Sequence, residues 1–316
     1  MSVDLTILIC THNRAGLLAG ALESLEEQSL SRERFEVIVV DNASADDTSA
    51  VVARCQARGR IAPRYVLEPE LGLDAARNRG IREAAGDLVA FLDDDARARY
   101  DWAASILAGF ELHDAPILGG RVELIWEIPR PAWFSDVLLR YLIHLDYGPQ
   151  PLEVTSPPWL YGTNVAFRKS LFQELGLFRL DLDRKGDSLM GGGDTEFFVR
   201  ARSRGRRLQY LPTIVVRHLA PASRLTRKFF RERLFFSGYT RAAHGTESAV
   251  QVALNCLVFL AGSPLCFLAA AGWRLLGKPG RSFAQERRAL LGAGYLYYWM
   301  KRAAGRVPPP RQEAWT

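Results

Sequence analysis

The strongest constraint on the fold is an alternation, repeated over the first 125 residues, of short apolar runs and longer amphipathic stretches. The apolar runs are rich in β-branched residues and predict strands at 5–10, 35–40, 63–68, 87–92 and 115–120. The stretches between them predict helices at Ala15–Gln28, Asp46–Ala57, Ala75–Ala84 and Trp102–Leu112. Strands connected through helices favour an α/β fold with a mainly parallel sheet sandwiched by helices on both faces.

Residues 126–160 are too rich in proline for regular structure and too rich in aromatic residues for a plain linker, so we expect a long loop or lid. After it, YGTNVAFRKSLF predicts a strand entering a helix, and GGGDTEFFVRARSRG predicts a glycine loop entering a helix. RRLQYLPTIVVRH predicts a last strand. The globular domain is therefore expected to close near His218, which divides the chain into domains at 1–220 and 221–316.

The net charge of +6 is unevenly distributed along the chain. Residues 221–316 contain 15 Lys and Arg but four Asp and Glu, whereas residues 1–220 contain 26 and 31. Because these cations flank long apolar runs, they favour an anionic membrane surface over nucleic acid as the partner.

The apolar stretch 249–273 is long enough to span a bilayer, since about 20 apolar residues suffice. Pro264 lies near its middle, where proline breaks or kinks a helix. We therefore expect a helical hairpin that dips into the cytoplasmic leaflet. A complete span, a buried helix pair and an oligomer contact are the alternatives.

The first residues and the cysteines indicate a reduced, cytosolic setting. Met1–Cys10 has the pattern of a strand and leads into polar residues, so no signal peptide is expected. The four cysteines lack the C-x-x-C spacing of zinc sites and suggest no disulfide framework. Together with the basic apolar segment, these features predict a protein on the cytoplasmic face of the cell (inner) membrane.

Three consecutive carboxylates, Asp93, Asp94 and Asp95, follow the apolar strand at 87–92. In parallel sheets ligands bind at the carboxyl ends of the strands. These carboxylates repel one another unless a cation or hydrogen-bond donors neutralise them, which predicts a Mg²⁺ or Mn²⁺ site. The alternative is a solvated acidic turn. The same repulsion suggests that replacing Asp95 with alanine leaves the fold intact.

Two other predicted strands also end in polar residues, at Thr11–Arg14 and at Asp41-Asn42. We assign capping of the following helix to Ser44 or Asp46, and predict that Asp41 accepts hydrogen bonds from a base or ribose. Arg77, in GLDAARNRG, lies on a helix next to the acidic cluster, where a cation balances a diphosphate.

Five motifs, in this order and spacing, resemble the family 2 glycosyltransferases with the glycosyltransferase A-type fold: ILICTHNRAG, IVVDNASADDT, GLDAARNRGIREAAGDLVAFLDDD, YGTNVAFRKSLF and GGGDTEFFVRARSRG. The resemblance covers residues 3–220. It implies inverting transfer from a nucleoside diphosphate sugar, with UDP as the default nucleotide and FLDDD as the metal-binding D-x-D motif. The implied donor-binding residues are Thr11, Asn13, Arg14, Asp41, Arg77 or Asn78, Asp93 and Asp94.

The resemblance also implies a catalytic base at the start of the helix in GGGDTEFF. The family usually carries Glu-Asp there, whereas this chain has Gly193-Asp194. We predict that Asp194 takes the proton of the acceptor hydroxyl, with Glu196 as the alternative base and a plain helix cap as the structural alternative. In related enzymes a histidine at the position of His218 completes the metal site with Asp93 and Asp95, although a solvent-facing histidine is the alternative.

The sequence thus predicts a metal-dependent hexosyltransferase that acts on a lipid-linked or membrane-proximal glycan acceptor in polysaccharide synthesis, with self-association left open. A sugar nucleotidyltransferase is an alternative, but it requires a glycine- and Arg/Lys-rich phosphate loop where THNRAG stands. A non-catalytic membrane scaffold would explain the absence of Glu at position 193, but the retained Asp93, Asp95 and Asp194 argue against it.

Overall fold

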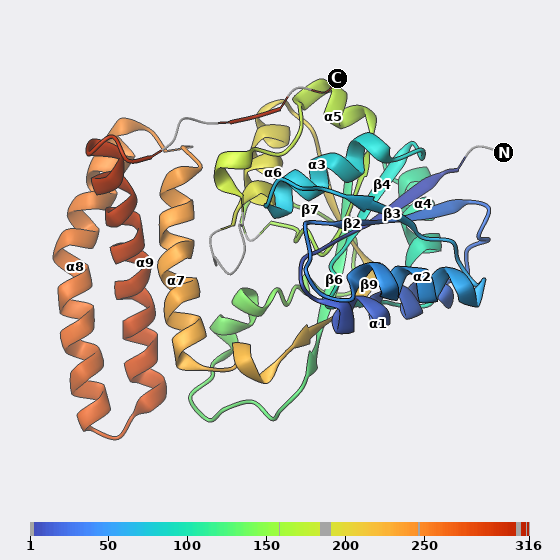
Figure 1. Ribbon diagram of the computed structural model, residues 1–316. Helices are drawn as coiled ribbons and strands as arrows, with labels where there is room; N and C mark the ends of the chain where they lie inside the picture. Colours follow the sequence, from blue (N-terminus) through green and yellow to red (C-terminus); the bar gives the residue numbers. More distant parts are fainter. Residues whose placement is uncertain are drawn as a thin grey trace.

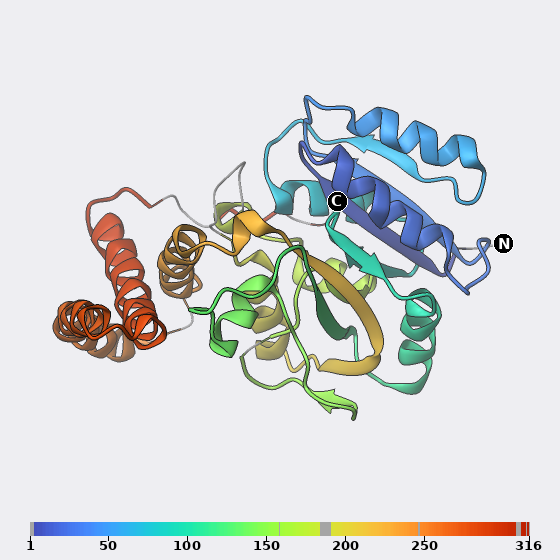
Figure 2. The same cartoon turned by 90° about the horizontal axis from the view of Figure 1, so that it is seen from below.

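A computed structural model of the 316-residue chain describes residues 3–157, 159–183, 191–245, 247–307, 311–313 and 315. A central sheet is covered by helices, and three long C-terminal helices stand to one side of it (Figures 1 and 2).

The first half of the sheet is parallel. It consists of β1 (Leu5–Thr11), β2 (Phe35–Asp41), β3 (Arg64–Leu67) and β4 (Leu88–Leu92). The connecting helices are α1 (Ala15–Glu26), α2 (Thr48–Arg58) and α3 (Leu73–Glu83). Figure 1 shows α3 on one face of this half and α1 and α2 on the other. The predicted sheet sandwiched by helices is confirmed, because fully buried apolar strands such as β4 require cover on both faces.

The second half of the sheet is mixed. Its elements are β5 (Ala96–Ala98), α4 (Trp102–Leu112), β6 (Ile117–Trp126), β7 (Leu152–Glu153), β8 (Asn164–Arg168), α5 (Ser170–Leu175), α6 (Gly193–Ser203) and β9 (Leu208–Ala220). Strand β8 is antiparallel to β4 and β6, and β9 is parallel to β6. The strand order across the whole sheet is β3-β2-β1-β4-β8-β6-β9-β5, with β7 paired to β9. The short β5 pairs antiparallel with β9 and sets Ala96 opposite His218, which brings that histidine to the acidic cluster.

The segment 126–160 is anchored rather than a free lid. It contains a short 3₁₀ helix at Asp136–Leu142. Trp133 and Phe134 stack edge-on against Phe230, and Trp133 also packs on Phe283, so this segment shares a core with the C-terminal helices. Aromatic pairs of this kind contribute about 0.5–1.5 kcal/mol each beyond the area they bury.

The C-terminal region forms α7 (Arg227–Ala243), α8 (Ala249–Leu275) and α9 (Pro279–Ala303), with α9 packed against both of the others. Helix α8 is continuous, so the predicted break at Pro264 is wrong. Proline removes one backbone hydrogen bond. Helix α8 tolerates this loss because it has 27 residues, begins with a Ser248–Gln251 capping box and packs closely on α9.

Helix α8 leaves most of its apolar surface uncovered. Leu257 is 65% exposed and Leu268 is 70% exposed. Among the residues that the structure describes, α8 is the one helix long and apolar enough to cross a membrane.

The chain end returns from α9 to the sheet domain. Gln312 forms a β-bridge with Arg179, and Glu313 accepts from Arg82 at 2.6 Å. Trp315 packs against the main core. The C-terminal helices are therefore tied to the sheet domain both through α7 and through the chain end.

Candidate active site

Two cavities meet at the carboxyl ends of β1 and β4. The smaller, of about 310 Å³, is lined by residues 10–14 together with Asn42, Leu73, Ala76, Asp93 and Asp94. The larger, of about 940 Å³, extends from the sheet to α7, α8 and α9. Both cavities include Leu73 and Asp93 in their lining, so Asp93 stands at the junction between them.

The smaller cavity is shaped by the loop that follows β1. Thr11 donates its hydroxyl to Asp94 Oδ2 at 2.8 Å, and Arg14 donates to Asp94 Oδ1 at 3.0 Å. Asn13 adopts a left-handed backbone (φ 53°), and its Oδ1 accepts from the backbone N–H of Ala45 at 2.7 Å. The structure thus brings the predicted donor-binding residues Thr11, Asn13, Arg14, Asp93 and Asp94 to one cavity.

Asp41 and Asn78 lie outside both linings. Asp41, at the end of β2, accepts from the Tyr65 hydroxyl at 2.5 Å and from the backbone N–H of Ser44 at 2.9 Å. Burial and this carboxylate raise the pKa of Tyr65 to about 12. Asn78 is fully buried and bonds both the N–H and the carbonyl of Phe178. Its amide therefore fastens α3 to the segment before α6.

Asp95 is the most strongly held carboxylate of the acidic cluster. It is 3% exposed and accepts from Arg224 at 3.0 Å and from Arg14 at 3.4 Å, while His218 Nε2 lies 3.0 Å from its Oδ1. Burial opposes its ionisation, but His218 and the two guanidiniums outweigh burial and hold the pKa of Asp95 well below its usual range. Burial and the neighbouring Asp95 raise the pKa of Asp94 to about 6.

The predicted metal ligands come together. One ligand atom from each of Asp93, Asp95 and His218 lies within 4.8 Å of the other two. Two carboxylates and an imidazole are a donor set that suits Mn²⁺, and the carboxylates also suit Mg²⁺. The Asp93 carboxylate is 31% exposed at the cavity junction, so an ion held here would remain open to a substrate.

Arg77 carries positive charge into the larger cavity. It is 6% exposed, pairs with Asp74 at 3.1 Å, and its guanidinium lies 5.4 Å from the centre of the Phe91 ring. Burial lowers the pKa of Arg77, but Asp74, Asp194 and Asp93 outweigh burial and raise it. This arginine therefore stays charged beside the candidate metal site.

Two carboxylates of this region carry no recognisable sequence signal. Asp183 accepts from the backbone N–H of Asp74 at 2.7 Å and thereby caps α3 from a distant part of the chain. Burial, opposed by Arg77, raises the pKa of Asp74 to about 8. A carboxylate in the first turn of a helix is ordinary capping chemistry, so sequence alone does not separate Asp74 from a surface cap.

Asp194 lies in the first turn of α6 and lines the larger cavity. Its Oδ2 accepts from the backbone N–H of Gly162 at 3.2 Å. At the preceding position, a Cβ on Gly193 would come within 1.9 Å of Asp74 Oδ2. The Asp74 carboxylate therefore occupies the space that the side chain of a glutamate at position 193 would enter.

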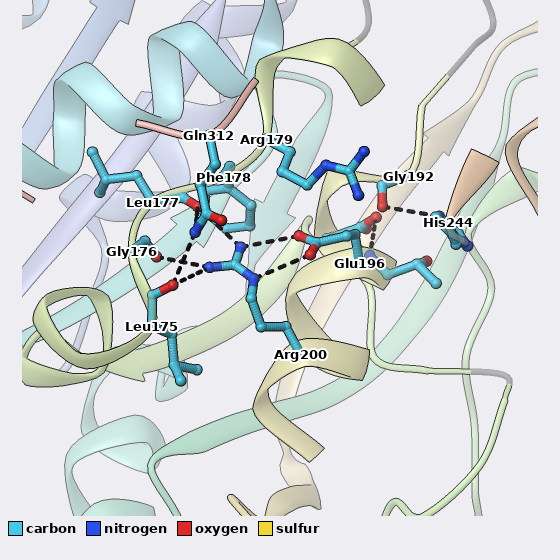
Figure 3. Close-up of polar contacts among 12 residues, drawn as sticks. Leu175, Gly176, Leu177, Phe178, Arg179, Gly192, Glu196, Arg200, His244 and Gln312 are labelled. Atoms are coloured by element: carbon cyan, nitrogen blue, oxygen red, sulfur yellow. Dashed lines mark hydrogen bonds and ion pairs between the residues drawn. The ribbon is translucent and has the colours of Figure 1, made fainter. Parts of the chain in front are cut away.

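Glu196 has a different environment from Asp194. Its carboxylate pairs with Arg200 at 3.0 and 3.1 Å, and Arg200 also donates to the carbonyls of Leu175, Gly176 and Leu177 (Figure 3). Glu196 lines neither cavity. In this arrangement it holds α6 against the segment after α5, whereas Asp194 faces the cavity.

Comparisons with known proteins identify the family to which this chain is similar. The family described as Glycosyl transferase family 2 matches residues 6–176, more than half of the chain. The succinoglycan biosynthesis protein ExoM of Rhizobium meliloti is 27% identical over 93% of this chain and 92% of its own length. The glucosyl-dolichyl phosphate glucuronosyltransferase of Haloferax volcanii is 26% identical over 76% of each chain.

Solved structures show the same fold. The mannosyltransferase PcManGT from Pyrobaculum calidifontis, in complex with GDP-Man and Mn²⁺, aligns with a TM-score of 0.63 at 22% identity, covering 95% of this chain and 88% of its own. Staphylococcus aureus TarS (residues 1–349), in complex with UDP-GlcNAc, aligns with a TM-score of 0.55 at 15% identity, covering 96% and 93%. The chain has the glycosyltransferase A-type fold and belongs to glycosyltransferase family 2.

Proposed function

We propose that this chain is an inverting, metal-dependent glycosyltransferase that moves a sugar from a nucleoside diphosphate sugar to a lipid-linked acceptor during glycan or polysaccharide synthesis. The observation that carries the proposal is the position of Asp93. It belongs to the Asp93, Asp95 and His218 group and lies where the two cavities join. A donor with its nucleotide in the smaller cavity would present its sugar to the larger one.

The protein groups have distinct roles in this proposal. Asp93, Asp95 and His218 would hold Mn²⁺ or Mg²⁺, which would supply positive charge to the leaving diphosphate. Arg77 adds a fixed positive charge beside them. Asp194 accepts the proton of the acceptor hydroxyl as that oxygen attacks the sugar from the side opposite the diphosphate.

Inversion is what the resemblance to family 2 glycosyltransferases implies. A single displacement needs one carboxylate to take the acceptor proton, the role proposed here for Asp194 in the lining of the larger cavity. Asp94 is bonded to Thr11 and Arg14, and Asp95 is bonded to Arg14 and Arg224, which favours Asp194 as the carboxylate that meets the acceptor. Family membership disfavours the sugar nucleotidyltransferase alternative.

Helix α8 and the basic C-terminal region are the parts of the chain proposed to bind the membrane. An apolar helix whose exposed face includes Leu257 and Leu268 gains about 25 cal/mol for each Å² of apolar surface it removes from water. Fifteen Lys and Arg in residues 221–316 add attraction to an anionic leaflet. The Haloferax relative is named for an acceptor that is a dolichyl phosphate, which supports a lipid-linked acceptor here.

The test is a screen of nucleoside diphosphate sugars with Mn²⁺ or Mg²⁺, scored by donor hydrolysis and by thermal stabilisation of the full-length protein. We expect one nucleotide class to stabilise the protein only with metal present and to be consumed slowly. Asp93→Asn should lose both effects, while Asp136→Asn, at an exposed carboxylate outside both cavities, should retain them. Failure of every donor and metal combination would overturn the proposal.

A further inference from the structure

The larger cavity joins the candidate catalytic carboxylates to the C-terminal helices. One part of its lining contains Asp93, Arg77 and Asp194. Another part comes from α7, α9 and the apolar helix α8, which contributes Phe259. A molecule that fills this cavity therefore contacts both the site of chemistry and the helix proposed to meet the membrane.

This lining carries more arginine than acid. The arginine cluster, as we define it, consists of Arg140 from the 3₁₀ helix, Arg233 from α7, and Arg287 and Arg288 from α9. Arg77 is paired with Asp74, and Arg241 is paired with Glu247 at 2.7 Å. Within the described parts of the chain, no ion pair involves Arg140, Arg287 or Arg288. Arg77 and Arg241 are thus balanced by carboxylates, whereas these three arginines are not.

A further observation indicates that the cluster is suited to an anion. Arg287 Nε is buried and has no hydrogen-bond partner among the described residues. Arg140 and Arg288 are exposed and Arg287 is half-buried, so the charges of these three arginines are accessible to a ligand in the cavity. A buried donor without an acceptor costs free energy, so an anion that accepts from Arg287 Nε would offset that cost.

The cavity also offers apolar and aromatic contacts next to these cations. Trp159, Tyr161, Leu291 and Tyr295 line it together with Phe259. A volume of about 940 Å³ is large enough for more than a free phosphate ion. Its lining therefore suits a ligand that joins an anionic group to an apolar chain.

We propose that the arginine cluster binds the phosphate or diphosphate of a glycolipid acceptor, whose apolar chain leaves along α8 and whose terminal sugar reaches Asp194. This inference rests on the proposed function and narrows its acceptor to phosphate-bearing lipids. Guanidinium groups are suited to this role because they bind phosphate oxygens through two hydrogen bonds at once.

The test measures binding of farnesyl diphosphate, a short isoprenyl diphosphate, to the full-length protein in non-ionic detergent by titration calorimetry. A chelator is present, so that the diphosphate does not bind through a metal at Asp93. Farnesol and inorganic diphosphate are titrated in parallel. The test variant is Arg287→Gln/Arg288→Gln. Its control, Lys228→Gln/Arg281→Gln, removes the same charge from α7 and α9 outside the cavity.

We expect farnesyl diphosphate to bind the wild type more tightly than either comparator, and the test variant to bind it at least about 10-fold more weakly. The control variant should bind it as the wild type does. If farnesol binds the wild type as tightly as farnesyl diphosphate does, recognition of the phosphate is refuted. If inorganic diphosphate binds as tightly as farnesyl diphosphate does, recognition of the apolar chain is refuted. If the test variant and the control variant lose affinity for farnesyl diphosphate by the same factor, the arginine cluster is not a specific site and the binding reflects general surface charge.

The donor screen on the wild type is scored separately. A protein that binds farnesyl diphosphate but consumes no donor contradicts the proposed function and leaves the anion site standing. If the wild type consumes a donor but the test variant and the control variant bind farnesyl diphosphate equally well, the result contradicts the anion site alone.

Discussion

Replacing Asp95 with alanine should destabilise the metal-free protein. The substitution leaves Arg14, Arg224 and His218 around a space from which the balancing charge has gone. Removing one partner of a buried ion pair costs about 3–5 kcal/mol. The Arg14 side chain is 31% exposed and partly regains water, so we expect the lower end, about 3 kcal/mol. For a domain of this size the melting temperature should then fall by roughly 6–10 °C.

The same substitution should remove the response to metal. A metal present at 100 times its dissociation constant stabilises the folded protein by about 2.7 kcal/mol. Thermal unfolding with and without Mn²⁺ measures both effects in Asp95→Ala, with the size-matched Asp95→Asn and the exposed-site Asp136→Asn beside it. An Asp95→Ala protein that melts at the wild-type temperature and is still stabilised by Mn²⁺ would refute both the charge network and the ligand assignment.

The pH dependence gives an independent check on the network. The folded pKa of Asp95 lies below its unfolded value of about 4, so the stability it contributes is present above that pH and is lost as pH falls further. The difference in unfolding free energy between wild type and Asp95→Asn should therefore be constant from about pH 5 to about pH 7, and should shrink below about pH 4. A constant difference down to about pH 2 would contradict this reasoning.

Three further substitutions test other parts of the structure. The folded pKa of Asp74 is about 8 and its unfolded value is about 4, so the wild type should lose stability as the pH rises between these values. Urea unfolding midpoints measured across this pH range should show the decline in the wild type and should not show it in Asp74→Asn. An unchanged profile in the variant would contradict the burial of this carboxyl. Gly193→Ala should cost about 1–3 kcal/mol because its Cβ meets Asp74 Oδ2, and Asp74→Ala should relieve that cost in the double variant; additive costs would show that the two sites do not meet. Leu257→Lys/Leu268→Lys on α8 should weaken flotation with phosphatidylglycerol vesicles, whereas Leu112→Lys, at an exposed leucine of α4, should not; recovery of the wild type without detergent as a discrete oligomer that ignores these vesicles would defeat membrane attachment.

The parallel half of the sheet was predictable from sequence because its signals are local. Each of β1, β2 and β4 is an apolar run of five to seven residues, and polar side chains follow it directly. Strand β5 has three residues and no apolar run that distinguishes it from a turn. Its pairing with β9 places His218 beside Asp95, so the metal group was predicted from motif resemblance rather than from strand pattern.

The charge balance around the acidic cluster was not predictable from sequence. Arg14 and Arg224 are 210 residues apart along the chain and meet at Asp95 through the fold alone. The expectation that alanine at position 95 leaves the fold intact treated the three carboxylates as a repelling group. The structure shows instead that the cations outweigh the repulsion at Asp95, so that expectation is replaced by the destabilisation predicted above.

Long-range packing accounts for the remaining differences. The aromatic residues of 126–160 suggest a lid, but Trp133 and Phe134 contact Phe230 from α7. Pro264 suggests a break, but close packing of α8 on α9 keeps one helix. The sequence predicts Asp194 as the base with Glu196 as the alternative, and the ion pair between Glu196 and Arg200 now distinguishes the environments of the two carboxylates.

The central claim is that Asp194 activates the acceptor hydroxyl while the donor is bound with its metal. The most direct test measures the turnover number of Asp194→Asn at saturating concentrations of metal and of a donor identified in the screen. The account predicts a fall in turnover of about 10²-fold or more with donor affinity nearly unchanged, since loss of a general base affects the chemical step. Wild-type turnover in Asp194→Asn, together with a comparable loss in Glu196→Gln, would contradict it.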